Sequence, residues 1–169
     1  MNVLAVFGAG ILMSAISSVV IARLYAWPWL LSKEREQALA TLVTPHMFLR
    51  FIGLSFLVPG VVSGPLPAGF AVPAAYGDFT AGVLAIIAMT ALSARASWAI
   101  AAVWVFNVWG AADLLLALFD GPRFGLHPGN LGAAYFIPTV IVPPLLVTHL
   151  LIFGLLARGA RKSHPAGAR

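Results

Sequence analysis

The chain has 169 residues, of which 61% are hydrophobic and only 9% are charged, whereas a soluble domain carries about 25% charged residues. A water-soluble domain cannot bury this much apolar surface, so the composition predicts a single-domain polytopic membrane protein. The formal charge of +5 does not indicate nucleic-acid binding, because the cations lie in short segments between apolar runs. The absence of cysteine excludes disulfides and thiolate metal sites.

The apolar runs predict an all-α helical bundle of about five transmembrane helices within residues 1–157. The expected spans cover residues 2–22, 45–62, 79–94, 97–119 and 131–157. The first run lacks the positively charged start of a secretory signal, so we interpret it as a membrane span. Its small residues recur at every fourth position, which predicts a contact with a second copy or a partner subunit through Gly10, Ser14, Ser18 and Ala22.

Residues 32–43 place charges on one side and apolar side chains on the other, which predicts a short helix lying on the membrane surface. Thr44-Pro45 then resembles a helix start, with a capping hydroxyl followed by a proline at the first helical position. Arg50 would lie only about 7 Å beyond that start, so its side chain is expected to extend back to the surface. His46 shares a face with Arg50 and is expected still nearer the surface.

The remaining connections follow from turn residues. The proline-rich segment 63–78 predicts a loop that rests against the membrane or is partly re-entrant. Asp78, at its end, is expected to cap the third helix. Asp120-Gly121-Pro122 indicates a turn after the fourth helix. The fifth helix is expected to start at an Asn130 cap and to be kinked by Pro138, Pro143 and Pro144.

The cations predict how the chain is threaded, because lysine and arginine favour the cytoplasmic side of a membrane. Five spans put the termini on opposite sides. If the basic tail, residues 158–169, is cytoplasmic, Arg123 is left as the one cation outside. The expected cytoplasmic set is Arg23, Lys33, Arg35, Arg50, Arg95, Arg158, Arg161, Lys162 and Arg169. The N-terminus is therefore predicted outside, in an inner (plasma) membrane.

Two polar side chains lie within the fourth span, where a carboxylate is costly and indicates a functional site. Asn107 and Asp113 stand about 120° apart on the helix with Gly110 between them, which predicts a small polar groove. We expect these residues to form an upper group, and His149, Arg50 and His46 to form a lower group towards the cytoplasm. Titratable groups at different depths suit a proton or small-ion pathway. The alternative is that they only hydrogen-bond across helices and fix their packing.

Three stretches resemble a group of small, multi-spanning bacterial membrane proteins without an assigned activity. They are PAGFAVPAAYGD at 67–78, FNVWGAADLLLA at 106–117 and FIPTVIVPPLLVTHLL at 136–151. The matching positions are Gly77-Asp78, Asn107, Gly110, Asp113-Leu114, Pro143 and His149. This resemblance covers the last two-thirds of the chain. It implies the five-span fold, a bacterial inner membrane and the same polar residues, but no activity.

The predicted function is binding or transport of a small ligand or proton at a site formed by Asn107, Gly110, Asp113, His149, Arg50 and His46. One alternative is an electron-transfer protein that binds quinone or haem b, with His46 and His149 as axial ligands. Another is a structural or accessory subunit. An enzyme is not favoured, because the sequence contains no HExxH motif, phosphate loop or nucleophile–base pair. We expect no bound metal, no cofactor and no nucleic-acid partner. The expected partner is the lipid bilayer that surrounds the helices.

Overall fold

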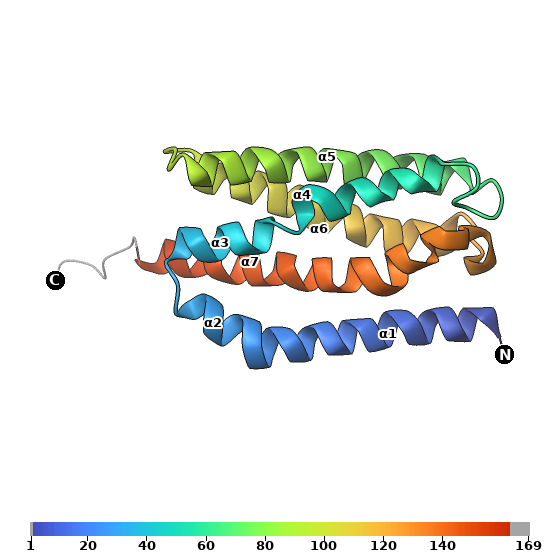
Figure 1. The fold of residues 1–169 in the computed structure, drawn as a ribbon, viewed down its shortest axis with the longest axis horizontal. Helices are drawn as coiled ribbons and strands as arrows, with labels where there is room; N and C mark the ends of the chain where they lie inside the picture. Colours follow the sequence, from blue (N-terminus) through green and yellow to red (C-terminus); the bar gives the residue numbers. More distant parts are fainter. Residues whose placement is uncertain (1, 163–169) are drawn as a thin grey trace.

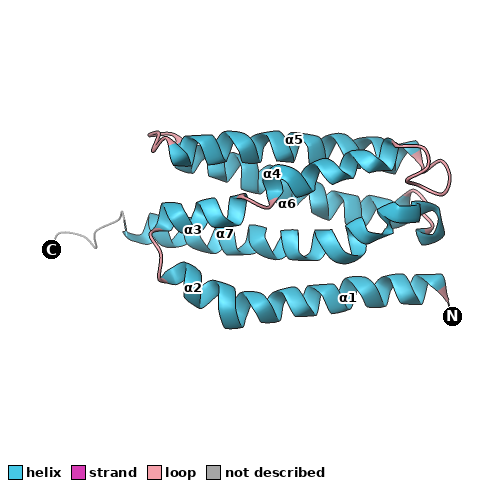
Figure 2. Cartoon of the chain, viewed as in Figure 1, coloured by secondary structure: helices cyan, strands magenta, loops and turns pink. Residues whose placement is uncertain are grey.

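The computed structural model describes residues 2–162 and is a bundle of helices (Figures 1 and 2). Its α-helices are α1 (Val3–Ile21), α2 (Trp27–Leu31), α3 (Arg35–Val43), α4 (His46–Leu49), α5 (Ala68–Ser93), α6 (Ala99–Arg123) and α7 (Val142–Lys162). Short 3-10 or π-helices continue or connect them: η1 (Ala22–Ala26), η2 (Arg50–Leu57), η3 (Pro128–Tyr135) and η4 (Ile137–Ile141). The all-helical fold is confirmed.

Five helical stretches are long and apolar enough to cross a membrane: Val3–Leu31, Arg35–Leu57, Ala68–Ser93, Ala99–Arg123 and Ile137–Arg158. They run along one long axis, with α1 starting at one end of the bundle and α7 ending at the other (Figure 1). α5 packs along α6 and against η2, and α7 packs between α6 and α1. These five stretches carry the fold.

The first stretch lies at the edge of the bundle and is apolar on every side. No residue of Val3–Ile21 is buried, and a helix without a polar face is typical of an apolar surrounding. Its less exposed side, which carries the predicted small-residue stripe, faces α7 and η4. A Cβ on Gly10 would lie 3.4 Å from the methyl carbon of Thr139. Within this chain the stripe is therefore covered, and its predicted role in a subunit contact stays a prediction.

The second stretch is one bent segment, in which α3, α4 and η2 follow each other. The prediction placed α3 on the membrane surface. In the structure, the apolar side of α3 instead packs against α5 and α7 and buries Ala38, Leu39, Leu42 and Val43. Thr44 caps nothing, because its hydroxyl donates back to the carbonyl of Ala40. Thr44-Pro45 is therefore the bend between α3 and α4, and the predicted capping role of the Thr44 hydroxyl is wrong. Arg50 lies about 22 Å of helical rise beyond Arg35, about two-thirds of the way along the segment.

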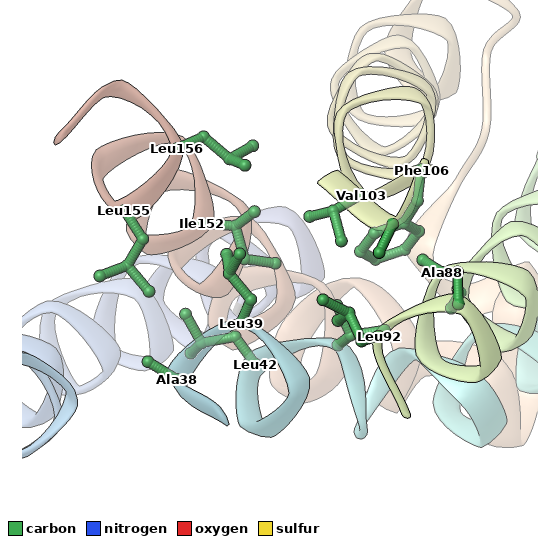
Figure 3. Packing of buried hydrophobic residues seen from close by; sticks show 14 of the residues in the cluster. Ala38, Leu39, Leu42, Ala88, Leu92, Val103, Phe106, Ile152, Leu155 and Leu156 are labelled. Atoms are coloured by element: carbon green, nitrogen blue, oxygen red, sulfur yellow. The ribbon is translucent and has the colours of Figure 1, made fainter. Parts of the chain in front are cut away.

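Two apolar clusters hold the helices together. One joins α3, α5, α6 and α7 towards the end of the bundle where α7 finishes (Figure 3), and includes Leu39, Leu42, Ala88, Leu92, Val103, Phe106, Ile152 and Leu156. The other joins η2, α5, α6, η3, η4 and α7 towards the opposite end, and includes Phe56, Phe70, Leu114, Leu131, Ile137 and Leu145. On α6 they are separated by the segment from Asn107 to Asp113, so the polar residues lie between two apolar layers.

Several predicted boundaries differ from the structure. α5 begins at Ala68 and contains Pro73, so most of the predicted loop 63–78 is helical and Asp78 lies inside the helix instead of capping it. α6 extends to Arg123, and the predicted turn at 120–122 is helical. Before α7, a positive φ of 54° at Gly132 interrupts η3, and η4 is a π-helix around Pro138. The side chain that caps η3 belongs to His127, not Asn130. Of the predicted basic tail, 163–169 lies outside the described residues.

Candidate functional site

Arg50 is the centre of a buried polar site. It is the first residue of η2 and is only 1% exposed. Its Nη1 donates to Asp78 Oδ1 at 2.5 Å and to Asp113 Oδ2 at 2.8 Å. Its Nη2 donates to the carbonyl oxygen of Gly110 and lies 3.2 Å from His149 Nε2. One guanidinium therefore links the second stretch to α5, α6 and α7.

His149 and Asn107 form a second layer of the site. His149 Nδ1 lies 2.7 Å from Asn107 Oδ1, and Asn107 Nδ2 donates to the backbone carbonyl of His149 at 3.2 Å. Because an amide oxygen can only accept, the hydrogen-bond pattern assigns the ring proton to Nδ1. The Nε2 of His149 is then free to accept from Arg50. Asn107 thus fixes the tautomer with which His149 faces the guanidinium.

His46 packs against this layer from the second stretch. Its ring centroid lies 4.4 Å from that of His149 and 5.1 Å from that of Phe106. Its Nε2 is 2.8 Å from the hydroxyl of Thr148, and that hydroxyl donates to Leu145, so His46 is the donor. Its Nδ1 has no hydrogen-bond partner among the described residues. We call Arg50, Asp78, Asp113, Asn107, His149 and His46 the Arg50 cluster.

Three glycines provide the space for this cluster. A Cβ on Gly53 would overlap the carboxyl group of Asp78, and a Cβ on Gly77 would overlap that of Asp113. A Cβ on Gly110 would lie 2.6 Å from His149 and 2.8 Å from Arg50. All three have helical backbones, where glycine costs about 1 kcal/mol relative to alanine. The reason for glycine at these positions is therefore space and not backbone conformation.

The structure brings all six predicted site residues together. The predicted separation into an upper and a lower group is wrong, because Arg50 contacts Asp113 directly. The predicted extension of Arg50 to the surface is also wrong, since the side chain is buried in mid-bundle. Asp78, Gly53 and Gly77 were not predicted as members of the site. The Gly77-Asp78 pair within the resemblance was a signal for two of them, and nothing in the sequence pointed to Gly53.

The cluster holds more negative than positive groups. Two carboxyl side chains, 9% and 12% exposed, share one guanidinium. His149 contributes no charge in the tautomer that accepts from Arg50, and no other cation of the described residues pairs with either carboxyl. An unpaired carboxylate is strongly disfavoured in a medium of low dielectric. One further positive charge, a proton or a cation, makes the cluster neutral.

The two carboxyls face different cavities. Asp113 lines a groove of about 910 Å³ between α5 and α6, together with Gly77 and Trp109. Asp78 lines a second cavity of about 450 Å³ towards the end of the bundle where α1 begins, together with Phe7 and His127. The Arg50 cluster is therefore approached by two cavities, one for each carboxyl group.

The two histidines do not fit the haem alternative. Axial ligands stand on opposite sides of the iron, whereas the His46 and His149 rings contact each other directly. Both nitrogens of His149 also have protein partners. Within residues 2–162 no group of three or more His, Asp or Glu side chains is placed to hold a metal ion.

Comparison with known proteins identifies a family. Residues 6–157 match the family described as "Domain of unknown function (DUF8737)". The matched range contains every residue of the Arg50 cluster, from His46 to His149. No curated protein and no solved structure matches the chain.

Proposed function

The chain belongs to the DUF8737 family, and we propose that it is an integral membrane protein whose Arg50 cluster binds a proton and passes it across the membrane. Five stretches with the length and apolarity of membrane spans support the location. The surface of the bundle supports it as well, because large apolar side chains such as Leu12, Leu116 and Leu150 are more than half exposed.

The distribution of cations favours one orientation. Lys33, Arg35, Arg95 and Arg158 all belong to the end of the bundle where α7 finishes, whereas Arg123 belongs to the opposite end. Arg50 no longer counts towards either end, because it lies in the middle. Since basic residues favour the cytoplasmic side, we propose an N-terminus outside the plasma membrane of a bacterium. Asp78 and its cavity then open towards the outside, and His46 lies on the cytoplasmic side of the cluster.

The observation that carries the proton assignment is the arrangement of two carboxyls, one buried and one partly buried, around one guanidinium. A proton bound by either carboxyl neutralises the cluster, and Asp78 and Asp113 lie near each other because both accept a hydrogen bond from the same Nη1. His149 and His46 continue the set of titratable groups by direct ring contact. Buried titratable groups at short separations are typical of proton relays in membrane proteins.

Proton flux into vesicles tests this function. The full chain is reconstituted into phosphatidylcholine vesicles with a trapped pH dye, and a valinomycin-imposed potential drives protons inward. We expect the wild-type protein to acidify the interior faster than protein-free vesicles, and Asp113→Asn to lose this difference. Asp120→Asn is the matched control, because Asp120 lies on the same helix and, among residues 2–162, pairs only with the exposed Arg123. Equal flux for Asp113→Asn and wild type would remove the proposal.

A second candidate is a purely structural role, in which the cluster clamps the helices together. The contacts of Arg50 with three neighbouring helices favour it. The same experiment separates the two candidates. If Asp113→Asn lowers the thermal stability but no protein-dependent flux exists in the wild type, the structural role is the correct one.

A further inference from the structure

We propose that the groove between α5 and α6 binds a lipophilic organic cation, whose positive charge takes the place of the proton at Asp113. This inference rests on the proposed function, because it names a second occupant for the same carboxyl group. A lipophilic cation is an organic molecule with a permanent or amine-borne positive charge and an apolar body, able to enter from the membrane.

The groove has the size and the lining for such a molecule. Its volume is about 910 Å³, within the range of sites for small organic ligands. Except for the two acidic side chains, a tyrosine and a threonine, its lining consists of apolar or aromatic residues and Gly77. Val105, Val108 and Leu116 of α6 are each more than half exposed along it. An apolar body can therefore lie along the groove without desolvating polar protein groups.

Asp113 is directed into this groove. Its carboxyl occupies the space that a side chain at position 77 would take, and both residues line the groove. The indole Nε1 of Trp109 donates to the Gly77 carbonyl at 3.3 Å, which holds the indole beside the carboxyl group. One carboxyl oxygen receives the guanidinium of Arg50 on the inner side. The same carboxyl group therefore faces the buried cluster and the groove.

The charge of the lining selects a cation. Among the described residues that line the groove, the charged ones are Asp113 and Asp120, and both are acidic. Asp120 is neutralised only weakly, by Arg123 at 3.5 Å with a side chain that is 63% exposed. Tyr76, Trp104 and Trp109 add aromatic rings, whose faces attract cations. An anion or a neutral acyl chain would gain nothing from these features.

The exchange with a proton follows from the groups around Asp113. Arg50 of η2 pairs with Asp113 directly, and Asp78 of α5 pairs with the same guanidinium. His149 of α7 faces Arg50 from another side. Two carboxyls share one guanidinium, so the cluster accepts one additional positive charge. A bound cation at Asp113 supplies that charge, and the proton leaves to solvent. We therefore expect the release of about one proton for each cation bound.

Binding to the full chain in phosphatidylcholine nanodiscs tests the proposal, with tetraphenylphosphonium as the probe and tetraphenylborate as an anion of the same size. We expect saturable binding of the phosphonium with proton release, little protein-dependent binding of the borate, and loss of phosphonium binding in Asp113→Asn. Ala112→Phe fills the groove and should weaken binding about tenfold or more. Ala101→Phe is its control, because Ala101 lies three turns away on the same side of α6 and outside the groove.

The possible results separate this proposal from the proton function. If Ala112→Phe does not fold, Val108→Trp fills the same groove from an exposed position. The absence of saturable phosphonium binding, equal binding of both ions, or equal affinity in the groove-filling and control variants overturns the cation proposal. Proton flux measured without any added organic cation tests the proton function separately, so the failure of one proposal can be told from the failure of the other.

Discussion

The first two apolar stretches of the chain differ in how much of each is buried in the bundle. Val3–Leu31 runs along the edge of the bundle, and within Val3–Ile21 no residue is buried. Arg35–Leu57 bends at Pro45, is partly buried, and carries Arg50 into the centre. Apolar composition is enough to make a span of either kind. The difference teaches that the depth of a charged residue depends on where its span begins, and not on its distance from the nearest proline.

Removal of the Arg50 charge should destabilise the protein most, and far more than removal of a charge in the first stretch. Arg50→Met leaves two buried carboxyls without their partner, which costs about 3–5 kcal/mol in buried pairs. Arg23→Met, in the exposed first stretch, should change the free energy of unfolding by less than about 0.5 kcal/mol. Thermal unfolding in one detergent measures both variants. A similar melting temperature for the two would show that the Arg50 cluster does not hold the helices together.

A pair of glycines sharpens the comparison at smaller cost. Gly110→Ala places a methyl group against His149 and Arg50, and overpacking of this kind costs about 1–3 kcal/mol. Gly8→Ala, in α1, meets nothing within 4 Å and should be neutral or stabilising by up to about 1 kcal/mol. Denaturant unfolding of both variants measures the difference. Equal stability would mean that the space at Gly110 is not required.

The smallest effect concerns the bend itself. Thr44 donates its hydroxyl to Ala40 inside the segment, so Thr44→Ala should cost less than about 0.5 kcal/mol. A true N-cap at this position would cost about 1 kcal/mol. Ser18→Ala, whose hydroxyl makes the same kind of bond to Ser14 in α1, is the matched control. A cost for Thr44→Ala well above that of the control would restore Thr44-Pro45 as a helix start.

The sequence predicted the number of long apolar helical stretches, because the length and composition of such stretches do not depend on packing. It located boundaries poorly where proline and glycine gather. Pro73, Gly69 and Gly77 suggested a loop, yet α5 is continuous through them. In an apolar surrounding, a helix remains the best way to satisfy backbone polar groups, even at the cost of one missing donor. Because the helix continues through these turn-forming residues, Asp78 lies inside α5, whereas the prediction placed it at the helix end.

The candidate site was predictable only in part. Asn107, Gly110 and Asp113 could be found because they share one helix, whose geometry is known in advance. Gly53 could not be distinguished from Gly8, since both are helical glycines and only their neighbours differ. The contact between Arg50 and Asp113 joins two helices 63 residues apart. Such a contact depends on the tertiary packing and leaves no local pattern.

The order of the partners of Arg50 along the chain has a consequence for biogenesis. Asp78, Asp113 and His149 follow the arginine by 28, 63 and 99 residues, so they leave the ribosome one after another. In the membrane location proposed above, the second helix therefore enters the insertion machinery with an uncompensated guanidinium. The arrival of α5 supplies the counter-charge, and α6 adds a second carboxyl that exceeds it. Assembly of the bundle then ends when the last helix brings in a neutral imidazole that accepts from the guanidinium.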